Sequence, residues 1–182
     1  MKNIILIIGD SSKELKNVRN LALASILVSI KLILGLFTIP ILPTLSVGFT
    51  FLPTAIIGFL FGPIIGALCG LVSDLLGYII HPTGPFFFGF TIVAIVTGIV
   101  YGSFLYKKKI TIKRCFFTAL FVTIFLNLGL NTFFLAILYN KAFIALMFPR
   151  IIKNMLTLIV NTVLLFIVLK KVEILKTEYK FK

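Results

Sequence analysis

The chain has 182 residues, of which 60% are hydrophobic, and its mean hydropathy is +1.18. Such a hydropathy excludes a soluble domain, because apolar runs of roughly 18 residues or more are typical of membrane-spanning helices. The formal charge of +13 does not indicate nucleic-acid binding, since the basic residues flank the apolar runs as the positive-inside rule predicts.

The apolar runs predict a single membrane domain, residues 1–182, that folds as an all-α bundle of six transmembrane helices. The first run, Ile4–Ile8, is too short for a cleaved signal peptide, and we expect no cleavage. Short proline-containing segments separate the first four spans, and Pro149 suits the first turn of the last helix. The expected spans are about 20–38, 47–61, 63–80, 86–106, 113–138 and 149–169.

The basic residues predict the orientation of the bundle. With a cytoplasmic N-terminus, six spans place 14 of the 18 Lys and Arg residues inside, and the outer loops contain only Lys141. Any odd number of spans would place a basic cluster outside. We therefore expect a multi-pass protein of the cell membrane with both termini cytoplasmic.

Four charged residues interrupt the apolar runs at a similar depth in the outer half of the membrane. They are Lys31 in the first span, Asp74 in the third, and Arg150 and Lys153 at the start of the sixth. A charge in hydrocarbon costs at least a few kcal/mol, so these groups are expected to face the bundle interior or a cavity. Their net charge is positive, which favours an anionic ligand.

Amides and aromatic rings occur at the same depth. Cations beside aromatic faces suit a flat ligand that carries carboxylates. The predicted substrate-binding residues are Arg150, Lys153, Lys31, Asp74, Tyr78, Phe86, Phe87, Phe88, Asn127, Asn131 and Asn154.

Each of these residues also has a structural interpretation. Asp74 can form a structural ion pair with Lys31 or Arg150, and the two cations near Pro149 can extend to the membrane interface. The phenylalanines can be surface that faces lipid. His81 is expected to be a solvated loop residue.

Small residues recur at helical spacing in two of the spans. Gly62, Gly66 and Gly70 repeat every four residues, which predicts close packing of the third span within the bundle. Ala22, Ser25 and Ser29 form a second stripe on the first span. That stripe can serve internal packing or provide a groove for a helix of a partner protein.

The sequence contains no pattern of an enzyme. It has one intramembrane acid and one histidine, so neither a nucleophile with its base nor a set of acidic metal ligands is present. Cys69 and Cys115 are expected to be free thiols, and we expect no metal and no cofactor. No phosphate-binding loop occurs, so the chain is not expected to hydrolyse ATP.

Two segments resemble the substrate-binding S components of energy-coupling factor (ECF) vitamin transporters. They are GPIIGALCGLVSDLLGY at residues 62–78 and HPTGPFFFGF at residues 81–90. The stretch FPRIIKN at residues 148–154 resembles the folate branch of that family. The six-span size matches over nearly the whole chain.

This resemblance implies a vitamin-binding subunit that takes its ligand from outside. Members of the family associate with a T-type membrane subunit and two cytosolic ATPases, which use the ATP. Their first span contacts the T subunit through an Ala-x-x-x-Ala motif, for which Ser25 and Ser29, with Ala22 nearby, are the nearest match here. Segments 37–46 and 80–86 would form the outer gate.

Folate fits the predicted pocket. The two carboxylates of its glutamate tail can bind Arg150, Lys153 and Lys31, its flat pterin can stack on aromatic rings, and Asp74 can accept a pair of pterin N–H groups. Another anionic vitamin such as pantothenate remains an alternative. An alternative of a different class is a structural or channel-like membrane protein, although the inner halves of the spans are too apolar for a continuous polar path.

Overall fold

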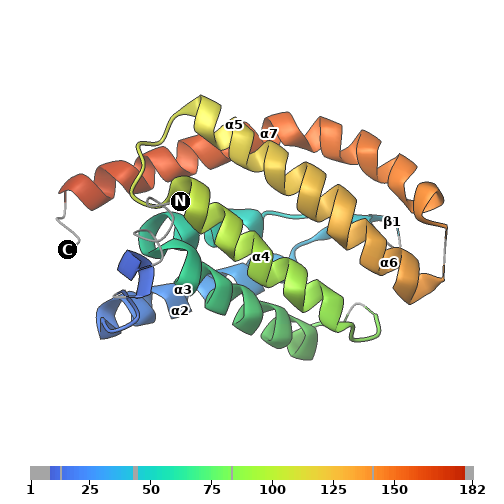
Figure 1. Cartoon of the computed structure of the whole chain (residues 1–182), viewed down its shortest axis with the longest axis horizontal. Coiled ribbons are helices and arrows are strands. Elements are labelled where there is room, and N and C mark those ends of the chain that lie inside the picture. Colours follow the sequence, from blue (N-terminus) through green and yellow to red (C-terminus); the bar gives the residue numbers. More distant parts are fainter. Residues whose placement is uncertain (1–8, 13, 43–44, 83, 141, 179–182) are drawn as a thin grey trace.

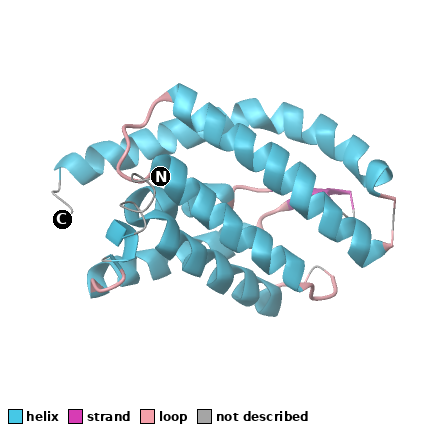
Figure 2. Ribbon diagram, in the orientation of Figure 1, coloured by secondary structure: helices cyan, strands magenta, loops and turns pink. Residues whose placement is uncertain are grey.

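The computed structural model describes residues 9–12, 14–42, 45–82, 84–140 and 142–178. The described residues form a helical bundle with one short β-hairpin, as Figures 1 and 2 show. The elements, in chain order, are α2 (Val18–Leu36), β1 (Ile39–Leu42), β2 (Leu45–Val47), α3 (Phe51–Ile80), α4 (Phe88–Leu105), α5 (Ile112–Phe121), η1 (Val122–Asn131), α6 (Thr132–Tyr139) and α7 (Phe143–Glu178). The all-helical membrane fold predicted from the sequence is therefore confirmed.

Among the described residues, five helical segments are long and apolar enough to cross a membrane, whereas the sequence predicts six spans. The difference lies in α3, which has 30 residues. A straight helix of that length would measure about 45 Å, well beyond the ~30 Å hydrocarbon core of a bilayer. The helix is not straight, because Gly62 has a φ of 85° and a ψ of −171°.

The second part of α3, after Gly62, runs antiparallel to α4. A Cβ atom added to Gly66 would lie 2.5 Å from the carbonyl oxygen of Gly98. One turn later, a Cβ on Gly70 would meet the backbone of Ala94. The two backbones therefore touch directly, which confirms the close packing that the glycine repeat predicts.

The first part of α3 runs in the opposite direction. Thr54 lines a cavity together with Thr97 of α4, and Gly58 packs against Tyr101 one turn further along that helix. Residues 51–61 thus run parallel to α4, and α3 is a helical hairpin that reverses at Gly62. The reversal lies between the second and third predicted spans, and a positive φ of this kind favours glycine.

The N-terminal segment holds this reversal in place. The Ser11 hydroxyl donates to the carbonyl of Phe61 at 2.8 Å and accepts from the N–H of Ile64 at 3.1 Å. Ser11 is fully buried. It therefore caps the second part of α3 from a distant point in the chain, as a residue at a helix N-terminus ordinarily does. Nearby, Tyr106 donates to the Glu14 carboxylate at 3.0 Å.

The fifth predicted span is continuous but irregular. Residues 112–139 form α5, η1 and α6 in succession, and η1 is a ten-residue π-helix. A π-helix closes its hydrogen bonds one residue later than an α-helix, so it is wider and redirects side chains. The apolar pattern of this span did not predict it.

Two predicted boundaries are wrong. The last helix begins at Phe143, so Pro149 lies inside α7 rather than in its first turn. The second span does not begin at Val47, because this residue belongs to β2, which pairs antiparallel with β1 and places Val47 opposite Ile39. The helix starts only at Phe51. The run Ile4–Ile8 and Lys141 lie outside the described residues.

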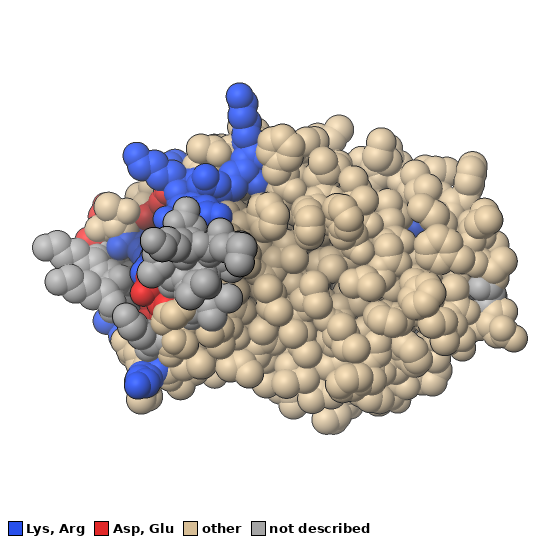
Figure 3. Space-filling model, in the orientation of Figure 1, with Lys and Arg blue, Asp and Glu red and all other residues tan. Residues whose placement is uncertain are grey.

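The basic residues gather at one end of the bundle. Figure 3 shows Lys and Arg side chains clustered at the end where the α4–α5 loop and the C-terminal part of α7 lie, whereas most of the remaining visible surface is uncharged. We call this the basic end. The described residues that form it include Lys107, Lys108, Lys109, Lys113, Arg114, Lys170 and Lys171.

Gly66→Ala is expected to destabilise the protein by about 1–3 kcal/mol, because its new methyl group would force the α3 and α4 backbones apart. Gly77→Ala is the matched control, since a Cβ there would lie 3.7 Å from a Leu32 methyl group, at ordinary contact distance. Thermal unfolding of both purified variants in detergent measures the effect. Equal midpoints for the two variants would contradict the close α3–α4 packing.

Ser11→Ala is expected to cost about 1–2 kcal/mol of stability, because the Ile64 N–H and the Phe61 carbonyl lose their partner. Its neighbour Ser12 is exposed and bonds only to the Gly9 carbonyl, so Ser12→Ala should leave stability unchanged. Chemical denaturation of both variants compares them directly. Indistinguishable transitions would show that residues 9–12 do not hold the reversal.

Candidate functional site

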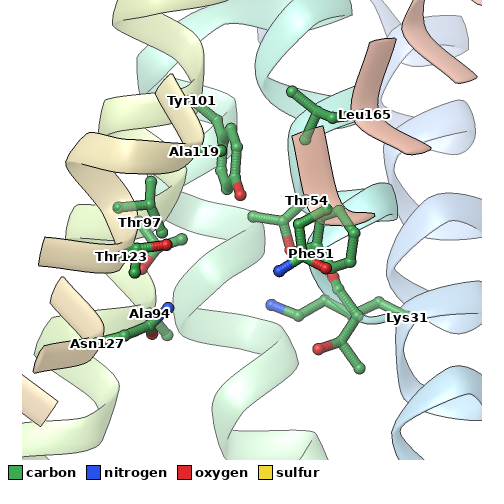
Figure 4. Close-up of a pocket in the computed structure, with 13 residues that line it drawn as sticks. Lys31, Phe51, Thr54, Ala94, Thr97, Tyr101, Ala119, Thr123, Asn127 and Leu165 are labelled. Atoms are coloured by element: carbon green, nitrogen blue, oxygen red, sulfur yellow. The ribbon is translucent and has the colours of Figure 1, made fainter. Parts of the chain in front are cut away.

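A cavity of about 190 Å³ lies between α2, the first part of α3, α4, the α5–η1 segment and α7. Figure 4 shows its walls. The lining mixes apolar residues with hydroxyl, amide and amine groups. The lining residues are Lys31, Thr50, Phe51, Thr54, Ala94, Thr97, Tyr101, Ala119, Val122, Thr123, Asn127, Asn161 and Leu165.

Two strong polar groups face each other across the cavity. Lys31 extends into it from α2, and Asn127 extends from η1 on the opposite side, as Figure 4 shows. The Lys31 ammonium donates to the Ser73 hydroxyl of α3 at 2.6 Å. Lys31 is the one Lys or Arg among the described lining residues. It supplies a positive charge at a site otherwise built from neutral groups.

The hydroxyl groups of the wall differ in what they offer a ligand. Thr54 donates to the carbonyl of Thr50 at 3.0 Å, and Thr97 donates to that of Val93 at 2.6 Å. Their hydrogens are therefore occupied, and their oxygens can accept. Tyr101 is 2% exposed, and its hydroxyl points into the cavity in Figure 4. A phenol in this position can donate to a ligand.

The π-helix shapes one wall of the cavity. Val122, Thr123 and Asn127 all belong to η1 and all line the cavity, although they span more than one turn. A wider turn brings side chains at this spacing onto one face. Unusual helical geometry of this kind frequently marks functional sites.

The structure places two of the predicted binding residues, Lys31 and Asn127, in the cavity wall. Arg150 is 6% exposed, donates to the Thr132 hydroxyl at 3.4 Å and does not belong to the lining residues. Lys153 is half-buried and lies close enough to interact electrostatically with Arg150. The other α7 amide, Asn154, is also buried outside the lining set. A role for these α7 residues stays a prediction, as does one for Asn131.

Asp74 does not line the cavity either. Its carboxylate accepts a hydrogen bond of 2.8 Å from Thr91 of α4, and its charge acts on Lys31 across the α2–α3 interface. The hydrogen bond that Lys31 donates goes to Ser73, the residue before Asp74 in the sequence.

The predicted aromatic residues gather around the α3–α4 loop. The rings of Tyr78 and Phe86 meet edge to face with centroids 5.1 Å apart. The ring centroids of Phe87 and of Phe134 in α6 are 5.7 Å apart, and Phe88 is exposed at the start of α4. None of the four predicted rings lies in the wall of the described cavity. Their role in ligand binding therefore stays a prediction.

The sequence analysis did not select most of the residues that form the wall. Thr54, Thr97, Tyr101 and Thr123 are polar interruptions of apolar runs, as Lys31 is, but an uncharged hydroxyl costs little in a helix and attracts less attention. The four-residue spacing of Thr97 and Tyr101 on one face of α4 was the available signal.

The stripe of small residues on α2 faces outward. Ala22, Ser25 and Ser29 are exposed, and the buried residues of the helix are Ala24 and Val28. The interpretation of this stripe as internal packing is therefore wrong. An exposed face of small residues permits close approach of another helix.

Comparison with known proteins identifies related chains. Residues 19–169 match the family described as the ECF transporter substrate-specific component. A folate transporter FolT from Clostridium novyi (strain NT) is 36% identical over 124 residues, which cover 68% of this chain and 72% of that protein. A folate transporter FolT from Leuconostoc mesenteroides subsp. mesenteroides is 29% identical over 144 residues, with coverage of 76% and 77%.

A solved structure shows the same arrangement of helices. The crystal structure of FolT bound with folic acid superposes with a TM-score of 0.76 at 30% sequence identity. The match covers 82% of this chain and 90% of the other chain. The similarity therefore includes nearly all of the bundle.

Proposed function

The chain belongs to the family of ECF transporter substrate-specific components, and from this premise we propose that it binds folate in the cavity around Lys31. As a member of that family it is a multi-pass membrane protein and a subunit of a transporter, not an enzyme. The proposed ligand is supported by the two FolT relatives and by the folic-acid complex of a FolT with the same fold.

The observation that carries the proposal is the position of Lys31. A lysine in a membrane span is costly unless it is compensated or used, and Lys31 reaches the cavity wall at a point where a ligand carboxylate can meet it. The Phe51 ring and the Tyr101 phenol line the same cavity. A pterin ring can stack on such side chains, and the Thr54 and Thr97 oxygens can accept its N–H groups.

Binding requires the cavity to widen. Its volume of about 190 Å³ is below the 300–1,000 Å³ typical of ligand sites. Thr50 and Phe51 line the cavity and directly follow the β1–β2 hairpin. We assign the outer gate to this hairpin and the α3–α4 loop, so that their displacement opens the site. Such a displacement also gives Arg150, Lys153, Asn131, Asn154 and the loop aromatics a route to the ligand.

We also assign partners and orientation. The exposed stripe of Ala22, Ser25 and Ser29 suits docking of the T-type subunit, and two cytosolic ATPases supply the energy. The basic end is assigned to the cytoplasm, which leaves the β1–β2 hairpin outside. In this orientation the proposed gate lies on the side from which a nutrient arrives.

Lys31→Met is expected to weaken folate binding about 10- to 100-fold, because a charge-assisted hydrogen bond contributes ~1.5–3 kcal/mol. Titration calorimetry in detergent measures the affinity without ATP. Lys171→Met, at the exposed basic end, is the control and should bind as the unsubstituted protein does. Arg150→Met in the same series tests the second predicted cation.

The outcomes of that titration separate the alternatives. Binding of pantothenate without folate would keep the family and overturn the proposed ligand. Binding of neither vitamin would favour the alternative interpretation of a structural or channel-like membrane protein. Folate binding that Lys31→Met leaves unchanged would keep the ligand and move the site elsewhere, toward Arg150.

Ser25→Phe is expected to leave folate binding unchanged and to lower folate uptake by cells several-fold, because a ring on the exposed α2 stripe blocks close helix approach. Ile99→Phe adds a ring to an exposed position of α4 and serves as the control. Binding is measured in detergent and uptake with labelled folate. Normal uptake by the Ser25 variant would exclude this stripe as the docking surface.

A further inference from the structure

We propose that Ser73, Asp74 and Thr91 are positioning residues that hold the Lys31 ammonium in place for a carboxylate of the ligand, an inference that rests on the proposed function. The three residues come from two helices, α3 and α4, and Lys31 comes from a third, α2. Asp74 thereby has a role behind the cavity wall, different from the contact with pterin that the sequence suggested.

Ser73 fixes the direction of the lysine. Its hydroxyl donates to the Gly70 carbonyl at 3.1 Å, which leaves its lone pairs free to accept from Lys31 at 2.6 Å. Ser73 is 4% exposed, so water does not compete for this bond. A lysine side chain has four flexible carbons, and without such an acceptor it would lose its orientation.

Asp74 compensates the charge of the lysine. Its carboxylate interacts electrostatically with Lys31 and is held by the Thr91 hydroxyl at 2.8 Å. Thr91 is fully buried, so water does not compete for the hydrogen bond that it donates to Asp74. A buried cation without a countercharge would be strongly destabilising in the empty protein.

The α3–α4 contact keeps this cluster rigid. Gly70 of α3 packs directly against the backbone of Ala94 of α4. Ser73 lies about one turn after Gly70 on α3, and Thr91 lies about one turn before Ala94 on α4. Because the two backbones meet there, the separation between Thr91 and Asp74 is set by packing and not by flexible side chains alone. The cluster is therefore a fixed platform for Lys31.

The arrangement leaves Lys31 able to bind a ligand. An ammonium group has three donors, and the described contacts use one of them on Ser73. A carboxylate that enters the cavity can take another donor while the bond to Ser73 remains. The ligand then finds a lysine that is already ordered, which reduces the entropy cost of binding.

A double-mutant cycle tests this inference with folate titrations in detergent. Ser73→Ala and Thr91→Val are each expected to weaken binding about 3- to 10-fold in the unsubstituted protein and to have no further effect in the Lys31→Met protein. Thr91→Ser keeps the hydroxyl and should restore the affinity. Thr118→Val removes another fully buried hydroxyl, which donates to the Arg114 carbonyl outside the cavity wall, and should not change it.

A second measurement does not depend on substituting Lys31. Folate with both carboxylates converted to amides has no charge for the ammonium to recognise. Ser73→Ala and Thr91→Val should bind this amide as the unsubstituted protein does. A purely structural role would weaken binding of folate and of the amide alike.

Three results would overturn the inference. The first is an equal loss of affinity from Ser73→Ala or Thr91→Val in the Lys31→Met background, and the second is an equal loss for the amide. The third is unchanged folate binding by Ser73→Ala and Thr91→Val while Lys31→Met binds weakly. This third result would overturn the inference but leave the proposed function intact. If the Lys31→Met protein binds folate normally, both the proposed folate site around Lys31 and this inference are wrong.

Discussion

Direct backbone contact between α3 and α4 determines where the rest of the structure lies. In lipid there is little hydrophobic force between helices, so close packing supplies the association energy. Gly66 and Gly98 allow this packing because neither has a side chain to separate the two backbones. Because the chain reverses at Gly62, the first part of α3 also packs along α4. Two helical segments of α3 therefore flank α4. The cavity lies between the first part of α3, α4, α2, the α5–η1 segment and α7.

The features that the sequence predicted correctly depend on local properties of the chain. A long apolar run is helical in a membrane wherever it occurs, and a glycine repeat packs closely against its neighbour. Lys31 and Asn127 could be selected because a strongly polar side chain in such a run requires a cavity or a partner. The membership in the family likewise rests on segments that are continuous in sequence.

The features that the sequence did not predict depend on contacts between distant segments. Ser11 and Ile64 are 53 positions apart, and nothing near Ser11 indicates that it caps a helix there. Nothing in the sequence near Arg150 indicates its hydrogen bond to Thr132 of α6, which depends on the packing of α6 against α7. The π-helix places Asn127 in the wall and is equally invisible to a count of apolar residues, because an apolar run is compatible with both π and α geometry.

The compensation of Lys31 by Asp74 also bears on selectivity. A cavity with a bare buried cation would attract any small anion, whereas here Asp74 and Ser73 interact with the Lys31 ammonium before the ligand enters. A ligand carboxylate joins these partners, but the charge of the lysine alone does not distinguish one anion from another. Discrimination among anions falls to shape and to the hydroxyl groups of Thr54, Thr97 and Tyr101, whose hydrogen bonds a poorly matched ligand would leave unmade. In the proposed site, the neutral part of the wall therefore sets the selectivity among anionic vitamins.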